Sequence, residues 1–292
     1  MHKIKFYIVL ITFFVIFVSC SGTKRENMSD TMQIKGSDTI VNLVQVWAEK
    51  FSQNNENLNI GVTGGGTGTG FAALLNNTCN IAMASRQAEE DEIDLAKKQN
   101  KIYKEFVVGL DGLAILVNKN NPVNNLTIEQ LRDIFMAKIT NWKEVGGEDR
   151  PIVLLSRESN SGTHMFFKEH VIRLNDEKSK DEFSLKALLM PSSQAIVDEI
   201  SQNPNAIGYV GIGFMESQTK TLYISTKGTT EFFKPTIENV MLGKYPISRP
   251  LYLYTNGEPT GIVKKFIDYT LSPEGQKVVV ETDFVPITTN NK

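Results

Sequence analysis

Short apolar runs rich in β-branched residues alternate along the chain with longer segments in which apolar residues recur at helical spacing. The first pattern is typical of strands and the second of the helices that cover a sheet. Strands are predicted at residues 32–35, 58–62, 79–84, 105–110, 113–118, 152–156, 206–210, 220–225 and 249–254. Helices are predicted at residues 40–54, 68–77, 89–100, 127–136, 161–174, 183–189, 193–202, 231–240, 259–270 and 272–280. This alternation predicts an α/β protein with mainly parallel sheets flanked by helices.

The helix predicted at 127–136 has the clearest start. Thr127 followed by Gln130 forms a capping box, in which each side chain accepts a hydrogen bond from the other residue's backbone. Apolar residues then recur at helical spacing, at Ile128, Leu131, Ile134 and Phe135. We expect this stripe to be part of the core.

The first nineteen residues have the composition of an export signal. Lys3 and Lys5 give a positive start, and residues 6–18 are apolar apart from Thr12. A membrane-spanning helix needs about 20 apolar residues, so this run is short for a span. We therefore predict a signal peptide at 1–19.

Cys20 follows the apolar run and Ser19, which is how the signal of a bacterial lipoprotein ends. We predict that Cys20 carries a lipid and that residues 20–31 form a flexible tether to the membrane. The alternatives are an ordinary cleavage site with Cys20 incidental, or a retained helical anchor. With Cys20 lipidated, Cys79 has no intramolecular disulfide partner and is expected to pack as a small apolar residue.

The length after the signal, about 270 residues, exceeds what one hydrophobic core usually organises, so two lobes are expected. The chain is predicted to cross between the lobes at Asp111-Gly112. It is predicted to return in residues 245–250, where two prolines prevent a helix. The predicted division is lobe 1 at 32–112 and 249–292, and lobe 2 at 113–248.

The formal net charge is −2, and removal of the signal takes it to −4. A basic excess of the kind that marks nucleic-acid binding is lacking, so no nucleic-acid partner is expected. If such a chain binds an anion, it must do so with locally aimed donors and a few arginines.

Three segments share one pattern: a strand-like run, then Ser, Thr and Gly residues, then a helical period. They are residues 34–39 (IKGSDT), 64–70 (GGGTGTG) and 157–163 (RESNSGT). Each places backbone N–H groups and hydroxyls at a helix N-terminus, where an anion is favoured. A single such segment is more often a plain helix cap or a turn. Three in one two-lobed chain favour an anion site.

The ligand suggested by these segments is a small bare anion. Residues 64–70 are followed by Phe71 rather than by the lysine of a nucleotide-binding P-loop. Arg157 opens the third segment, and Arg86 follows a predicted strand, so either guanidinium is a candidate oxyanion ligand or a surface ion pair.

Asp38 is the candidate that would distinguish phosphate from sulfate. At neutral pH phosphate still has a proton to donate and sulfate has none, so a buried carboxylate would accept from the first and repel the second. The alternative is that Asp38 only caps the following helix, and one carboxylate can do both.

The chain resembles the Pst-type phosphate-binding proteins of phosphate ABC transporters, in the second class of the periplasmic binding protein superfamily. The resemblance runs from about Gln33 to Val285 and is carried by residues 36–39, 67–70, 84–86, 139–142, 146–147, 157–163 and 206–210. It implies a two-lobed type II fold with the ligand in the cleft between the lobes, an ABC permease as partner, a monomer, and no cofactor or metal.

The resemblance also implies a set of phosphate ligands: Ser37, Asp38, Thr39, Thr67, Arg86, Arg157, Ser161, Gly162 and Thr163. One position departs from some members of the family, which have Asp where this chain has Arg86 and use that Asp to accept the phosphate proton. With arginine there, the accepting role falls to Asp38.

Transport is weighed against two other functions. A phosphate-ester hydrolase would need a nucleophile or a metal cluster. His164 and His170 lie on different faces of one predicted helix, so they cannot share a metal. An enzyme is therefore not expected. An adhesion or sensing protein would have no use for the anion-binding segments. Sulfate, molybdate or another tetrahedral oxyanion remains the alternative ligand.

Overall fold

The computed structural model describes residues 30–55, 58–176, 178–226, 228–229 and 231–287. The predicted signal at 1–19, Cys20 and residues 21–29 of the predicted tether lie outside this part. Residues 30 and 31, which the tether prediction included, instead begin the first strand. Within the described ranges, no helix has the length and apolar character needed to cross a membrane.

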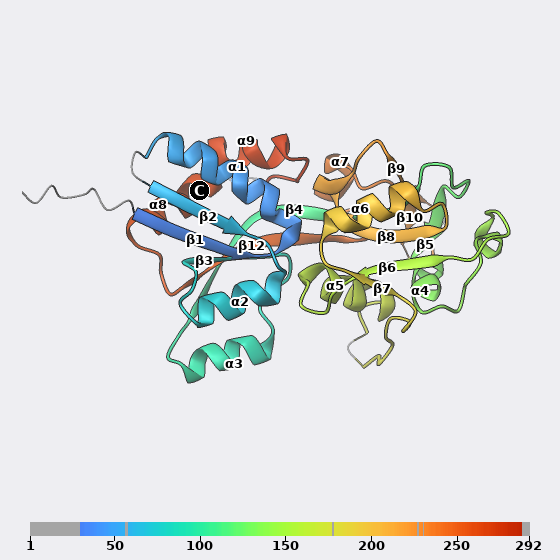
Figure 1. Ribbon diagram of the computed structural model, residues 1–292, viewed down its shortest axis with the longest axis horizontal. Coiled ribbons are helices and arrows are strands. Elements are labelled where there is room, and N and C mark those ends of the chain that lie inside the picture. The colour runs from blue at the N-terminus through green and yellow to red at the C-terminus, as the bar shows by residue number, and fades with distance from the viewer. Residues whose placement is uncertain (1–29, 56–57, 177, 227, 230, 288–292) are drawn as a thin grey trace, which may run out of the picture.

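The molecule has two halves joined by two long strands (Figure 1). The first half contains β1 (Asp30–Gly36), η1 (Asp38–Ile40), α1 (Val41–Gln53), β2 (Leu58–Thr63), α2 (Thr67–Leu75), β3 (Ile81–Ala84), α3 (Glu90–Lys98), α8 (Gly261–Leu271) and α9 (Pro273–Glu281). Helices α1, α8 and α9 cover one face of its sheet, and α2 and α3 cover the other. This is the α/β layering that the sequence predicts.

The second half lies on the other side of the joining strands. It contains β5 (Asn125–Thr127), α4 (Ile128–Phe135), η2 (Trp142–Val145), β6 (Val153–Arg157), α5 (Gly162–Phe167), η3 (Lys168–Ile172), β7 (Leu188–Met190), α6 (Ser193–Gln202), β8 (Ala206–Gly211), η4 (Ile212–Phe214), β9 (Thr219–Thr221), β10 (Tyr223–Ser225), β11 (Phe232–Phe233) and α7 (Ile237–Met241). The capping box of Thr127 and Gln130 at the start of α4 is confirmed.

One hydrogen-bonded sheet runs through both halves in the order β2-β1-β3-β12-β4-β8-β6-β7. The joining strands are β4 (Tyr103–Asn118) and β12 (Ser248–Asn256). The outer strands on each side pair in parallel, whereas β4 and β12 are antiparallel to each other. The sheet is therefore mixed, because one joining strand leaves the first half and the other returns to it.

Strand β4 changes partner at the predicted crossing point. It pairs with β12 up to Gly112 and with β8 from Leu113 onward. Asp111-Gly112 is thus part of one continuous strand, although separate strands at 105–110 and 113–118 were predicted. The change of partner supports the predicted lobe division at 112/113, which stays a prediction.

Two predicted helices are wrong in detail. Residues 188–190 of the segment predicted as a helix at 183–189 pair with β6 as an edge strand, and Pro191 disfavours helical geometry just before it. The segment 231–240 is interrupted by Pro235, so its helix begins only at Ile237, after the N-cap Thr236. In both places a proline outweighs the apolar periodicity.

Candidate functional site

The three Ser/Thr/Gly segments come together between the halves. Thr39 at the start of η1 and Thr163 at the start of α5 have their hydroxyl oxygens 2.7 Å apart. A Cβ on Gly162 would lie 2.4 Å from Oγ1 of Thr67, the first residue of α2. Three helix N-termini therefore converge at one place, which is the arrangement expected of an anion site.

Glycine is required at position 162 because the opposite half leaves no room there for a side chain. The same hypothetical Cβ would also lie 2.7 Å from the Ser85 hydroxyl oxygen. The neighbouring Ser161 is the N-cap of α5, and its Oγ accepts from the backbone N–H groups of Thr163 and His164. The local sequence Ser-Gly-Thr thus fixes the helix start and leaves room for the opposite half.

Buried hydroxyls from the first half form a small network beside these helix starts. Ser37 donates to Ser85 at 3.0 Å, and the hydroxyl oxygens of Ser85 and Thr67 are 3.4 Å apart. The backbone N–H of Ser85 donates to Thr67 Oγ1 at 3.1 Å. Ser85 is absent from the predicted ligand set, although it lies in one of the matching motifs, at 84–86.

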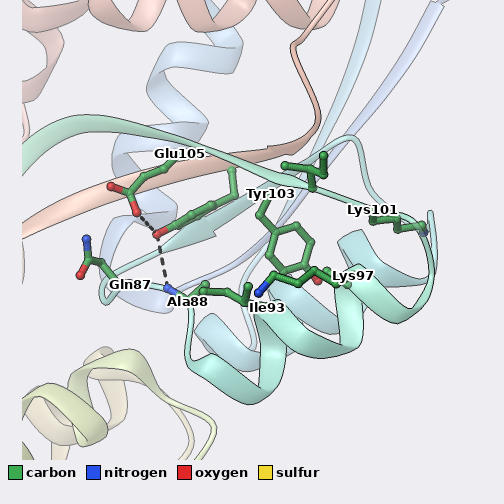
Figure 2. A pocket seen from close by; sticks show the side chains of 10 residues that line it. Gln87, Ala88, Ile93, Lys97, Lys101, Tyr103 and Glu105 are labelled. Atoms are coloured by element: carbon green, nitrogen blue, oxygen red, sulfur yellow. Dashed lines mark hydrogen bonds between the residues drawn. The ribbon is translucent and has the colours of Figure 1, made fainter.

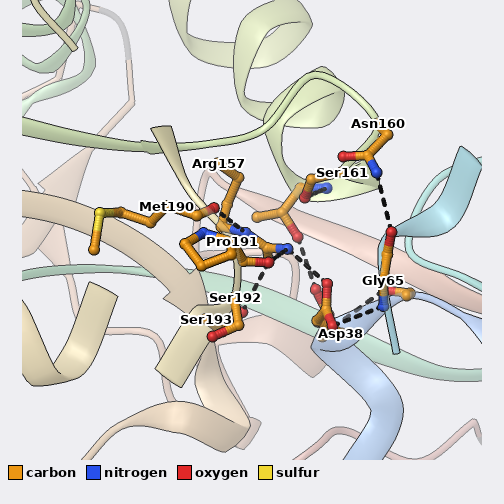
Figure 3. Close-up of polar contacts among 12 residues, drawn as sticks. Asp38, Gly65, Arg157, Asn160, Ser161, Met190, Pro191, Ser192 and Ser193 are labelled. Carbon is orange, nitrogen blue, oxygen red and sulfur yellow. Dashed lines mark hydrogen bonds and ion pairs between the residues drawn. The ribbon is translucent and has the colours of Figure 1, made fainter. Parts of the chain in front are cut away.

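Asp38 and Arg157 form an ion pair that joins the halves (Figure 3). Arg157 Nη2 lies 2.6 Å from Asp38 Oδ2, and the backbone N–H of Gly65 donates to Asp38 Oδ1 at 2.9 Å. The side chains of Arg157 and Asp38 are 2% and 13% exposed. A carboxylate offers about four lone-pair sites, so Asp38 can still accept another hydrogen bond.

Within its own half, Arg157 is held by three further acceptors. Its guanidinium donates to the carbonyl oxygens of Met190 and Pro191 at 3.2 and 3.0 Å, and to the Ser193 hydroxyl at 3.3 Å. These groups lie from the last residue of β7 to the first residue of α6 (Figure 3). The guanidinium is therefore oriented before any ligand arrives.

Asn160 makes a second link between the halves (Figure 3). Its Nδ2 donates to Gly65 O at 3.0 Å and to Thr69 Oγ1 at 3.4 Å. Its own carbonyl oxygen accepts from the Gly68 backbone N–H at 3.0 Å. The glycine-rich segment 64–70 is thus held against the third segment by neutral hydrogen bonds.

The guanidinium of Arg86 is engaged by acids that follow it in sequence. It forms two hydrogen bonds with Glu92, at 2.7 and 2.8 Å, and its Nε lies 3.2 Å from Glu89 Oε1. Burial alone would lower the pKa of Arg86, but the hydrogen bonds and charge of Glu92 outweigh it and raise the pKa. Its role as a phosphate ligand stays a prediction.

Sequence reasoning missed Arg249 and Asp111. Their side chains are 1% and 0% exposed, and Arg249 Nη2 lies 3.0 Å from Asp111 Oδ2. The same guanidinium reaches the hydroxyls of Thr39 and Thr163. Burial raises the pKa of Asp111 and lowers that of Arg249, and the ion pair opposes both shifts.

His164, beside the site, is a neutral residue at neutral pH. Burial lowers its pKa to about 4, and its Nδ1 lies 3.2 Å from the Ser156 hydroxyl oxygen. Among the described residues, the buried cations at the helix starts are Arg157 and Arg249.

A separate hollow of about 540 Å³ lies between α3 and β4 (Figure 2). Ile93, Tyr103 and Tyr254 contribute to its mostly apolar lining. The Tyr254 hydroxyl donates to Glu105 inside it. It shares no residue with the converging helix starts.

Comparisons with known proteins agree on one family. A model described as PBP superfamily domain matches residues 21–274. The chain is 33% identical over 282 residues to the phosphate-binding protein PstS of Pseudomonas aeruginosa, covering 90% of this chain and 85% of that protein. It is 31% identical over 301 residues to PstS of Bacillus subtilis, covering 98% and 95% respectively.

A solved structure gives the same result. The putative phosphate ABC transporter substrate-binding protein from Clostridium perfringens, solved with bound phosphate, is 32% identical. The match covers 89% of this chain and 100% of that one, with a TM-score of 0.79. Proteins of this kind bind a substrate for transport and are not enzymes. The chain therefore belongs to the Pst-type phosphate-binding proteins of phosphate ABC transporters, within the periplasmic binding protein superfamily, and has their two-lobed type II fold.

Proposed function

We propose that this protein captures inorganic phosphate between its two lobes and delivers it to the permease of an ABC importer. The observation that carries the proposal is the convergence of three helix N-termini and two buried arginines between the halves. The PstS names of the relatives point to the same ligand. Helix starts, hydroxyls and guanidinium groups are the donors that a small oxyanion requires.

The proposed phosphate ligands are the hydroxyls and backbone N–H groups of the three segments, together with Arg157. They are Ser37, Asp38, Thr39, Thr67, Ser161, Gly162 and Thr163. In the observed state several of these groups bond to one another, and phosphate would take over those bonds. Arg86 would join them only by exchanging Glu89 and Glu92 for the ligand.

Asp38 is the proposed acceptor of the phosphate proton. Its carboxylate is already near the converging donors and is anchored by the Gly65 N–H. Sulfate has no proton to offer at neutral pH, so it would face this carboxylate with an oxygen and bind more weakly. Asp38 would thus select phosphate while also pairing with Arg157.

Closure of the lobes is the proposed capture step. The bonds of Asp38 to Arg157 and of Asn160 to Gly65 link the halves and would be absent in an open state. The proposed lobes are 32–112 with 249–292 and 113–248, hinged where β4 and β12 cross.

The protein is proposed to act outside the cytoplasm as a monomeric lipoprotein. Signal peptidase cleavage after residue 19 would leave Cys20 as the lipidated N-terminus, and the segment from 20 would tether the lobes to the membrane. Cys20→Ser should abolish incorporation of a labelled fatty acid and release the protein from the membrane fraction. Continued labelling in the Cys20→Ser variant would contradict lipidation at this residue.

Isothermal titration of phosphate-free protein, residues 21–292, with phosphate and then with sulfate at neutral pH tests the binding proposal. We expect one-to-one binding of phosphate and far weaker binding of sulfate. Folded, ligand-free protein that releases no heat with phosphate would contradict the proposed function. Tight binding of sulfate instead would reassign the ligand within the tetrahedral oxyanions.

A further inference from the structure

Arg249 lies on β12 and Asp111 on β4, where the two joining strands pass from one half to the other. They are direct partners in the β12–β4 register, although 138 residues separate them in sequence. Both side chains are buried. This places a buried ion pair on the strands that both halves share.

The guanidinium of Arg249 contacts ligand segments from both halves at once. Its Nη2 lies 2.9 Å from Thr163 Oγ1 and 3.3 Å from Thr39 Oγ1. Its Nη1 donates to the carbonyl oxygen of Gly162 at 3.3 Å. These three residues are proposed phosphate ligands. Arg249 therefore lies next to the proposed phosphate position, on the far side of the ligand groups.

Asp111 fixes the direction in which Arg249 points. Its Oδ2 accepts from Nε and Nη2 of Arg249 at 3.1 and 3.0 Å, and its Oδ1 accepts from the Ile212 backbone N–H at 3.0 Å. The guanidinium also lies over the Phe166 ring, 5.3 Å from its centroid. The remaining N–H groups of Arg249 therefore face Thr39, Thr163 and Gly162.

These contacts set the donor direction of two hydroxyls. A hydroxyl oxygen that accepts from a guanidinium must turn its own hydrogen elsewhere, because it has a single hydrogen to donate. The oxygens of Thr39 and Thr163 are 2.7 Å apart, so one of the two donates to the other in the observed state. A phosphate bound on the side away from Arg249 would accept hydrogen bonds from both hydroxyls. The positive charge of Arg249 on the other side would strengthen both bonds.

We propose that Arg249, held by Asp111, is a positioning residue of the phosphate site that orients the Thr39 and Thr163 hydroxyls toward the ligand from opposite lobes. The inference rests on the proposed function. Strands β4 and β12 then take part in phosphate binding as well as in lobe closure. The hydroxyls of both lobes meet the same guanidinium only when the lobes are closed.

The test removes both charges together, since removing one would leave the other buried and unpaired. The purified mature chain carrying D111N/R249Q is compared with wild type by phosphate titration, and its folding is checked by thermal melting without phosphate. We expect a cooperative melt and phosphate binding at least about tenfold weaker, as loss of charge-assisted bonds predicts. The matched control is D133N/R132Q, which neutralises the partly exposed pair Arg132–Asp133 and should leave binding unchanged.

A double-mutant cycle separates positioning from a purely structural role. Thr163→Val is measured in the wild-type and the D111N/R249Q backgrounds. If Arg249 orients the Thr163 hydroxyl, the fold-loss of phosphate affinity caused by Thr163→Val is smaller in D111N/R249Q than in wild type. Equal losses in the two backgrounds would overturn the inference.

The outcomes distinguish this inference from the proposed function. Wild-type protein that binds no phosphate refutes the function itself. Wild type that binds phosphate beside folded D111N/R249Q that binds it equally well refutes only the role of Arg249. Should D111N/R249Q fail to fold, the cycle is run with Arg249→Lys, which keeps a charge opposite Asp111 but lacks the planar fork. Additivity there would overturn the inference as well.

Discussion

Two arginine–aspartate pairs lie beside the converging helix starts and differ in what holds them together. Asp38 and Arg157 come from different halves, and their contact exists only while the halves are close. Asp111 and Arg249 lie opposite each other on the two crossing strands, where the sheet itself keeps them together. The first pair is thus conditional on closure and the second is permanent.

One binding site can thus combine a cation that gives up its carboxylate partner, Arg157, with a cation that keeps its partner, Arg249. If the lobes open, Arg157 keeps its contacts with Met190, Pro191 and Ser193, while Asp38 keeps the Gly65 N–H. Arg157 is then an oriented cation without its carboxylate, ready for an anion. Arg249 never loses Asp111, so it acts on the ligand through the hydroxyls.

Removing the exchangeable cation should have the largest effect on binding. We expect Arg157→Ala to abolish phosphate capture, with affinity reduced by about a thousandfold or more, because Asp38 would remain as an uncompensated negative charge. Titration calorimetry measures the loss, and Arg132→Ala on the surface of α4 serves as the control. Arg157→Ala protein with near wild-type affinity would mean that phosphate binds elsewhere.

The permanent pair should matter more for stability than the exchangeable one. Asp111→Ala leaves Arg249 buried without its carboxylate, and we expect a loss of about 3–5 kcal/mol in the free energy of unfolding. Asp38→Ala should cost about 1–2 kcal/mol, because Arg157 retains three acceptors and the Asp38 side chain is 13% exposed. Urea unfolding without phosphate measures both. Equal losses would contradict the distinction between the pairs.

Asp38 should decide selectivity more than affinity. We expect Asp38→Asn to lower the ratio of sulfate to phosphate dissociation constants by at least about tenfold, because an amide no longer repels a fully ionised oxyanion. Glu158→Gln, which neutralises an exposed carboxylate in the same segment as Arg157, is the control. An unchanged ratio in Asp38→Asn would remove Asp38 as the discriminating acceptor.

The smallest effect is expected at the neutral link between the halves. Asn160→Ala removes the side-chain bonds to Gly65 and Thr69 but keeps the carbonyl that accepts from Gly68. Phosphate affinity should fall about three- to tenfold, mainly through faster release. Stopped-flow dissociation measures this, with Gln99→Ala as an exposed control. A loss as large as that of Arg157→Ala would show that closure depends on Asn160 rather than on the ion pair.

Local sequence patterns predicted most of the elements and the helix starts at the three Ser/Thr/Gly segments, whereas anion binding there stays a prediction. The Ser-Gly-Thr start of α5 and the capping box of α4 lie in a few consecutive residues, so their geometry is set locally. The helix predicted at 183–189 was wrong because pairing of β7 with β6 is a long-range contact that periodicity does not report.

The charge partners were harder to predict because they depend on the three-dimensional arrangement. Arg249 lies in the segment 245–250, whose two prolines predicted a connection, and its partner Asp111 is distant in sequence. Arg86 follows a strand as an anion ligand would, yet Glu89 and Glu92 occupy its guanidinium. Those acids lie three and six residues later, so this pairing had a local signal that the resemblance outweighed.

The most direct test is a crystal structure of the protein from crystals grown with phosphate. It shows whether phosphate binds beside one exchangeable pair, Asp38–Arg157, and one permanent pair, Asp111–Arg249. We expect phosphate within hydrogen-bonding distance of Arg157 and of the Thr39 and Thr163 hydroxyls, with the Asp111–Arg249 pair unchanged. Phosphate bound away from the three helix starts, or Arg249 separated from Asp111, would contradict this description.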